Sequence, residues 1–330
     1  MRLMRTPPDI SPHDLARWLK SLYAIRPRRA RFVAHGECGW LYLIFTEPDG
    51  DQPDYVLKLT QPDLCREGSF RQDVIVTHMA LYYDHGLRQI SPPPLRASTG
   101  LYINDLDGYQ AKLLPYIAGT PVSELEFTAS QQRKLGALIA TLHRCKLHDD
   151  ELPPVERFST NVVRQLGELL NMATVPSDDP IERDLRHTLR ELTPRLKRLS
   201  ARFVALAQAL RADEDLCAEF VICHGDPSAG NIIVSPDNNV YLIDWDTPIY
   251  APPERDLFFL RPWLDARESY AAIIGERQAD RRVLHYYQLE WDLGEIVDYG
   301  KRLLRGVHEE QQRLHDQREL HTHLEGMGLL

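Results

Sequence analysis

The spacing of apolar and polar residues predicts a chain that begins β-rich and becomes mainly helical. Apolar side chains recur at helical spacing from Leu15 to Leu22, and the preceding Ser11 and Pro12 are typical of a helix start. After residue 30 the apolar positions form short runs bounded by turn residues. These runs predict strands at Ala30–Ala34, Trp40–Phe45, Tyr55–Leu59, Gly100–Ile103 and Tyr109–Leu114. Between them, a helix is expected over about residues 65–84, ending near Gly86.

After Gly119 the pattern is helical, with one β-rich insert. Helices are predicted over Gln131–His143, Asn161–Met172, about 181–212 and about 254–306. The third of these is expected to be two helices broken near Pro194, because proline removes a helical hydrogen bond. The insert contains strands at Glu219–Cys223, Asn231–Val234 and Val240–Ile243. A polar tail that carries histidines closes the chain.

The composition is that of an ordinary globular protein. The 330 residues are 43% apolar and 26% charged, which argues against a disordered or collagen-like chain. The net charge of −9 disfavours nucleic acid and favours a small cationic partner. We expect no membrane segment and no secretory leader, because no apolar stretch is long enough. The five scattered cysteines predict reduced thiols in a cytoplasmic protein, and we expect a monomer or weak dimer.

The insert carries the most informative polar residues. They are the acid loop, His224-Gly-Asp226-Pro-Ser-Ala-Gly-Asn231, and the following Leu242-Ile-Asp244-Trp-Asp246. Either Asp or Asn alone would be a turn cap. Together, a strand, the acid loop and a returning strand that ends at Asp244 predict a hairpin with all three polar groups at one end. A carboxylate that accepts a hydroxyl proton, with Asn and Asp as oxygen ligands of Mg²⁺, is what phosphoryl transfer from a nucleotide requires.

These motifs resemble those of the aminoglycoside phosphotransferase family, which is related to choline kinases and more distantly to protein kinases. The resemblance covers about residues 30–305, and the stretch Leu242–Leu257 is most similar to the spectinomycin phosphotransferase branch. It implies an α+β, two-lobed protein-kinase-like fold with a small antiparallel sheet in the N-lobe and a larger, mainly helical C-lobe. The expected boundaries are residues 1–116 for the nucleotide-binding lobe and 117–330 for the catalytic and substrate-binding lobe.

The upstream residues contain candidates for the nucleotide site. Lys58, the one lysine of a predicted strand, suits the role of pairing the α- and β-phosphates. Its acidic partner is either Asp73, which fits the family spacing, or Glu67. The loop with Gly36 and Gly39 is shorter than G-x-G-x-x-G and is expected to hold phosphates through backbone N–H groups. The chain has no P-loop motif.

The resemblance also implies a hinge and a substrate side. Main-chain groups of Pro115, Tyr116 and Ile117 would bind the adenine edge. Acids beside aromatic rings suit a protonated amine, although charges at helical spacing also occur on plain solvated faces. The substrate candidates are Asp246, Tyr287, Glu290, Trp291, Asp292 and Glu295.

The predicted activity is phosphorylation of a hydroxyl group on a small cationic molecule, with ATP (or GTP) and Mg²⁺ as cofactors. The resemblance implies an aminoglycoside or aminocyclitol antibiotic such as spectinomycin, and hence antibiotic resistance. In this scheme Asp226 is the catalytic carboxylate, and Asn231 and Asp244 bind the metal. The alternatives are a metabolic kinase for choline, a sugar or an amino alcohol, and an inactive nucleotide-binding regulator.

Overall fold

The structure of the protein is a computed structural model that describes residues 7–33, 39–47, 50–61, 71–275, 278–304 and 310–329. The chain forms two compact units. Unit 2 contains the described residues up to Val155 together with Glu219–Gln278, and unit 1 contains Glu156–Ala218 and the described residues from Ala279 on. The boundary expected near residue 116 falls inside unit 2 and stays a prediction.

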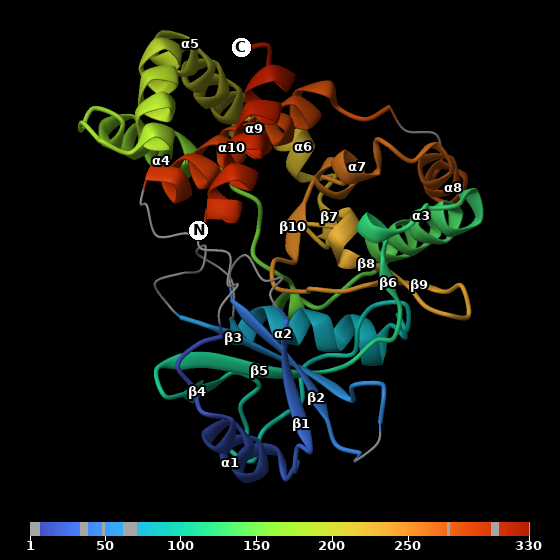
Figure 1. Ribbon diagram of the computed structural model, residues 1–330. Helices are drawn as coiled ribbons and strands as arrows, with labels where there is room; N and C mark the ends of the chain where they lie inside the picture. The colour runs from blue at the N-terminus through green and yellow to red at the C-terminus, as the bar shows by residue number, and fades with distance from the viewer. Residues whose placement is uncertain are drawn as a thin grey trace. The chain divides into compact units, whose positions relative to one another are not determined.

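Unit 2 begins with a five-stranded antiparallel sheet in the order β1–β2–β3–β5–β4 (Figure 1). The strands are β1 (Arg29–Val33), β2 (Trp40–Phe45), β3 (Tyr55–Thr60), β4 (Asn104–Leu106) and β5 (Tyr109–Pro115). The strand expected at Gly100–Ile103 is wrong. Gly100 has a φ of 85° and its N–H donates to the Ala97 carbonyl over 2.9 Å, so the chain turns there before β4 begins.

Two helices accompany this sheet. Helix α1 (Pro12–Tyr23) begins as predicted, with the Ser11 hydroxyl accepting from the Asp14 N–H at 3.0 Å. Helix α2 (Gln72–Met79), drawn on the opposite side of the sheet from α1 in Figure 1, continues into a π-helical turn, η2 (Ala80–Asp84). Apolar residues of α1 form one buried cluster with the sheet: Leu15, Trp18, Leu19, Ile44, Leu57, Leu59 and Leu113. These buried side chains occupy one face of the sheet, so the opposite face is left for other contacts.

The rest of unit 2 packs around helix α3. Short elements precede and follow this helix: β6 (Thr120–Pro121), η3 (Val122–Glu124) and η4 (Asp149–Glu151). Helix α3 (Ala129–Arg144) starts at Thr128 with a capping box and packs on α8 (Leu264–Ile274). A Cβ atom at Gly136 would lie 2.0 Å from the carbonyl oxygen of Ala266, so only glycine permits this close helix approach.

The predicted β-rich insert is confirmed as a set of short strands. They are β7 (Val221–Cys223), β8 (Ile232–Val234), β9 (Val240–Leu242) and β10 (Ile249–Ala251), with η5 (Ala229–Asn231) before β8 and α7 (Glu254–Leu260) after β10. The order β6–β8–β9 makes one sheet and β10–β7 another. Apolar residues of α3 and of these strands form one core, which includes Leu135, Ile139, Leu142, Ile222, Ile232, Leu242 and Trp245.

Unit 1 is helical over its described residues. Its helices are α4 (Asn161–Met172), α5 (Pro180–Arg211), α6 (Glu214–Cys217), α9 (Arg281–Leu304) and α10 (Glu310–Gly326). The break expected near Pro194 is wrong, because α5 is continuous through this residue. Buried Leu189 and Leu196 on either side hold one packed face, and the Thr193 hydroxyl donates to the Leu189 carbonyl over 2.8 Å. The polar tail is also helical, as α10.

Two further expectations can be compared with the described residues. No helix among them combines the length and apolar character that crossing a bilayer demands. The described cysteines, Cys145, Cys217 and Cys223, are free thiols.

Candidate active site

The β8–β9 hairpin brings Asp226, Asn231 and Asp244 to one end, as the sequence predicts. The Asn231 side-chain amide donates to the backbone carbonyl of Asp226 over 2.9 Å and to its Oδ2 over 3.0 Å. The Ile243 N–H donates to the Asn231 carbonyl over 2.9 Å, which places Asp244 one residue beyond this contact. The acid loop and the end of β9 are therefore tied together by hydrogen bonds.

Backbone geometry also holds the acid loop close to the residues that follow β9. Gly225 has a φ of 89°, and a Cβ atom there would lie 2.3 Å from the carbonyl oxygen of Thr247. Asp244 takes a left-handed φ of 64°, which is unfavourable for a residue other than glycine. Such conformations persist where the surrounding contacts impose them, and they gather at functional sites.

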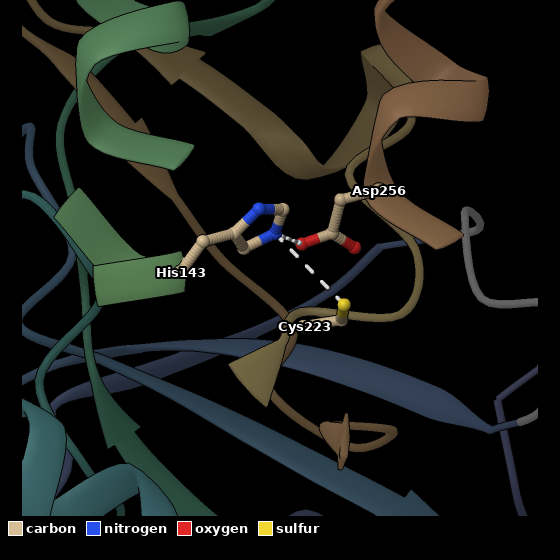
Figure 2. Close-up of side chains that lie close together, drawn as sticks. All are labelled: His143, Cys223 and Asp256. Carbon is tan, nitrogen blue, oxygen red and sulfur yellow. Dashed lines mark hydrogen bonds and ion pairs between the residues drawn. The ribbon is translucent and has the colours of Figure 1, made fainter. Parts of the chain in front are cut away.

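A buried carboxylate supports the acid loop from behind. Asp256 at the start of α7 accepts the backbone N–H groups of His224 and Gly225, each over 2.9 Å, and bonds His143 Nε2 over 3.2 Å (Figure 2). Its pKa would be raised by burial, but His143 and these hydrogen bonds hold it below the usual value. His143 and Asp256 therefore hold the backbone of the acid loop in place.

His143, Cys223 and Asp256 also form the one potential metal-binding cluster among the described residues. Their ligand atoms lie within 4.8 Å of one another, and Figure 2 shows the three side chains converging. However, burial raises the pKa of the Cys223 thiol well above its usual value, so the thiol stays protonated. His143 Nδ1 bonds the Tyr270 hydroxyl over 2.9 Å, and Asp256 is occupied by backbone donors. We interpret this cluster as structural.

Two lysines reach the acids at the end of the hairpin. Lys58 Nζ lies 2.7 Å from Asp244 Oδ1 and 2.6 Å from Asp246 Oδ2. Lys112 bonds the other oxygen of Asp246, Oδ1. In the antiparallel pairing of β3 with β5, Lys58 stands directly opposite Lys112, so both side chains leave the same face of the sheet.

The surroundings set different protonation behaviour for the two acids that the sequence singles out. Burial would raise the pKa of Asp244, but the ammonium groups of Lys58 and Lys112 outweigh this effect and lower it to about 2. Burial raises the pKa of Asp226, against the lowering effect of His224 and Ser228. Asp226 is therefore the more basic carboxylate of the pair, as proton acceptance requires.

The residues present suit a divalent cation bound by oxygen. Asn231 uses its Nδ2 atom for Asp226, which leaves the amide oxygen as its ligand atom. Asp244 stays ionised down to low pH. Carboxylate and amide oxygens are the ligands that Mg²⁺ prefers.

The other residues predicted for the nucleotide site do not lie beside Lys58 or are not described by the structure. Asp73 pairs with Arg71 and is exposed, so the structure does not bring it to Lys58. Local contact with an arginine two residues away explains this placement. Glu67 and Gly36 lie outside the described residues. At Gly39, a Cβ atom would lie 2.1 Å from the Leu59 carbonyl oxygen, which shows how closely the chain approaches β3 there.

The predicted hinge follows β5 directly. Pro115 is the last residue of that strand and pairs with Tyr55. The Tyr116 N–H donates to the Asp54 carbonyl over 2.9 Å, and Ile117 is half-buried. The main chain at Tyr116 is thus fixed by the sheet, while adenine binding stays a prediction.

The substrate candidates on α9 belong to unit 1. Tyr287 is only 2% exposed and its hydroxyl donates to Glu156 over 3.0 Å, so it is a core residue of that unit. Glu290 accepts from the Tyr286 hydroxyl over 3.2 Å, and Asp292 accepts from Gln288 over 2.8 Å. Trp291 is exposed, and Glu295 lies near His323. Their role toward a substrate stays a prediction.

Asp246, the remaining substrate candidate, is buried between the two lysines. Sequence reasoning missed Lys112 as a site residue. A signal for it exists, because Lys112 is the single charged side chain of the otherwise mainly apolar strand β5.

Comparisons with known proteins show which family and fold the chain is similar to. Residues 44–292 match the phosphotransferase enzyme family. Protein StrN of Streptomyces griseus is 33% identical over 81 residues, which are 24% of this chain and 22% of StrN. The match therefore spans about a fifth of the length of that curated relative.

Solved structures confirm the predicted two-lobed, protein-kinase-like α+β fold. The crystal structure of spectinomycin phosphotransferase APH(9)-Ia with ADP and spectinomycin is 21% identical, with a TM-score of 0.75 over 96% of this chain and 95% of that one. An aminoglycoside phosphotransferase of Alicyclobacillus acidocaldarius is 15% identical, with a TM-score of 0.54 over 98% of this chain and 95% of that one.

Proposed function

The chain belongs to the phosphotransferase enzyme family, and from this premise we propose that it transfers the γ-phosphoryl group of ATP to a hydroxyl group of a small cationic molecule. The proposed acceptor is an aminoglycoside or aminocyclitol such as spectinomycin, which would make antibiotic resistance its role. The observation that carries the proposal is the contact between Asp226 and Asn231 at 3.0 Å beside the Lys58–Asp244 pair at 2.7 Å.

Each residue has a distinct task in this proposal. Asp226 orients the acceptor hydroxyl and accepts its proton, while the hydroxyl oxygen bonds to the γ-phosphorus and the bond from phosphorus to the β–γ bridging oxygen breaks, releasing ADP. Asn231 and Asp244 would hold Mg²⁺, and Lys58 would contact the phosphates. Bound Mg²⁺ neutralises charge on the transferring phosphoryl group.

The surroundings of Asp226 support its assignment as the proton acceptor. Its Oδ2 accepts from Asn231, which fixes the carboxylate plane. Burial raises its pKa, which strengthens it as a base. The hinge, Pro115–Ile117, and the main chain at Gly36 and Gly39 would bind adenine and phosphates.

The acceptor proposal draws on the similarity to spectinomycin phosphotransferase, whose crystal structure contains ADP and spectinomycin. The net charge of −9 agrees with a cationic acceptor, but choline and amino alcohols are cations as well. The test must therefore compare acceptors directly.

We would measure ADP release with Mg-ATP and spectinomycin, several aminoglycosides, choline and simple sugars. Asp226→Asn keeps the shape of the side chain and should lower kcat by about 10²–10⁴-fold. Asp51→Asn, an exposed substitution in the same unit, is the matched control and should keep wild-type turnover. Turnover with an antibiotic supports the full proposal, turnover only with choline or a sugar replaces the acceptor, and an unimpaired Asp226→Asn variant overturns the mechanism.

A further inference from the structure

The sheet of unit 2 presents two lysines side by side on one face. Lys58 of β3 and Lys112 of β5 are direct cross-strand partners, and their side chains are 16% and 5% exposed. Like charges directly opposite each other destabilise a sheet. Burying each ammonium group adds a desolvation cost. An apolar side chain at position 112 would avoid both costs, so the lysine needs an explanation.

Asp246 provides the counter-charge for both lysines. One carboxylate oxygen bonds Lys58 at 2.6 Å and the other bonds Lys112. Lys58 also contacts Asp244 at 2.7 Å, so among the described residues these two lysines and two aspartates form one connected network, in which the Asp244 side chain is 38% exposed. The order along it is Lys112, Asp246, Lys58, Asp244.

We propose that Lys112 is a positioning residue of the phosphotransfer site. It holds one oxygen of Asp246, and the other oxygen of Asp246 fixes the direction of the Lys58 ammonium group. This inference rests on the proposed function, in which Lys58 contacts the nucleotide phosphates and Asp244 binds the metal.

The network explains how Lys58 can change partners on nucleotide binding. When Lys58 contacts phosphates instead of Asp244, it keeps its bond to Asp246, because Lys112 neutralises part of the charge on that carboxylate. Without Lys112, the whole charge of Asp246 acts on Lys58 and competes with the phosphates. Asp73 does not supply such a fixed partner, because its carboxylate is paired with Arg71. In this proposal Asp246 positions Lys58, and its role toward a substrate stays a prediction.

The test is a double-mutant cycle of Lys112→Met and Asp246→Asn, with Lys20→Met on the exposed face of α1 as the control. Lys112→Met should raise the KM for ATP at least tenfold, with a smaller change in kcat. It should also reduce the rise in melting temperature that Mg-ADP produces. In the double variant, the KM for ATP and the Mg-ADP-induced rise in melting temperature should both lie closer to the wild-type values than the two single effects combined would give. The reason is that both charges are removed together.

The outcomes separate this inference from the proposed function. If Mg-ADP leaves the melting temperature of the wild type unchanged, the proposed function fails. The melting temperatures of the four proteins without nucleotide (wild type, the two single variants and the double variant) still report the coupling between Lys112 and Asp246. If wild type binds and Lys112→Met matches Lys20→Met, or if the two substitutions act independently, the inference is overturned. If Lys112→Met does not fold, the double variant decides. A folded double variant supports the inference, whereas a double variant that is equally unfolded shows that Lys112 is a packing residue and overturns the inference.

Discussion

Substitution of Gly225 by alanine tests whether the acid loop is held in place by close backbone contact. The residue has a φ of 89°, and an alanine Cβ would lie 2.3 Å from the Thr247 carbonyl oxygen. A left-handed conformation costs an L-residue about 1–2 kcal/mol. Ordinary contact begins near 3.4 Å, so the two loops must separate by about 1 Å, and overpacking of this kind costs about 1–3 kcal/mol. We therefore expect Gly225→Ala to lower the free energy of unfolding by about 2–5 kcal/mol.

The measurement is urea unfolding followed by fluorescence, with Gly230→Ala as the matched control. Gly230 lies in the same acid loop, has no left-handed φ, and an added Cβ would meet nothing within 4 Å. The control should change the free energy of unfolding by less than about 1 kcal/mol. A loss below about 0.5 kcal/mol in Gly225→Ala would refute the reasoning, because it would mean that the loops separate without cost.

Two further predictions concern stability. Burial lowers the pKa of His78 from 6.5 to about 3. Between these two pH values the unfolded chain binds a proton at this histidine and the folded protein does not. The free energy of unfolding therefore falls by up to about 1.4 kcal/mol for each pH unit from pH 6.5 down to about pH 3. His78→Gln, which keeps a donor for the Ser91 carbonyl, should flatten that part of a urea-unfolding pH series; an unchanged slope would contradict this assignment. Pro194→Ala should raise the free energy of unfolding by about 1–3 kcal/mol, since proline is unfavourable inside a helix, and a loss of stability would show that its ring is needed for packing.

The sequence predicted those parts of the site that depend on local order along the chain. The hairpin that joins Asp226, Asn231 and Asp244 follows from one strand, one loop and one returning strand, all within a short segment. The acidic partner of Lys58 was left open between Asp73 and Glu67; Asp73 pairs with the nearby Arg71, and Glu67 lies outside the described residues.

The remaining features depend on contacts between distant segments. Lys112 lies opposite Lys58 because of the register between β3 and β5, and no local pattern in the sequence predicts this register. Helix α5 passes through Pro194 because packed leucines on both sides outweigh the local cost of proline. Helix α10 buries mainly Leu320 and Leu324 and an ion pair of Asp316 with Arg302, so its apolar stripe was too sparse to predict a helix.

The two-lysine face of the sheet also has a consequence for synthesis on the ribosome. Lys58 precedes Asp244 by 186 residues, and Lys112 precedes Asp246 by 134. At about 5–20 residues per second, roughly 10–40 seconds separate translation of Lys58 from that of Asp244. During that interval the nascent sheet carries two adjacent ammonium groups without the carboxylates that later neutralise them. The contacts of Lys58 and Lys112 with Asp244 and Asp246 can therefore form only after β9 and the residues that follow it have left the exit tunnel.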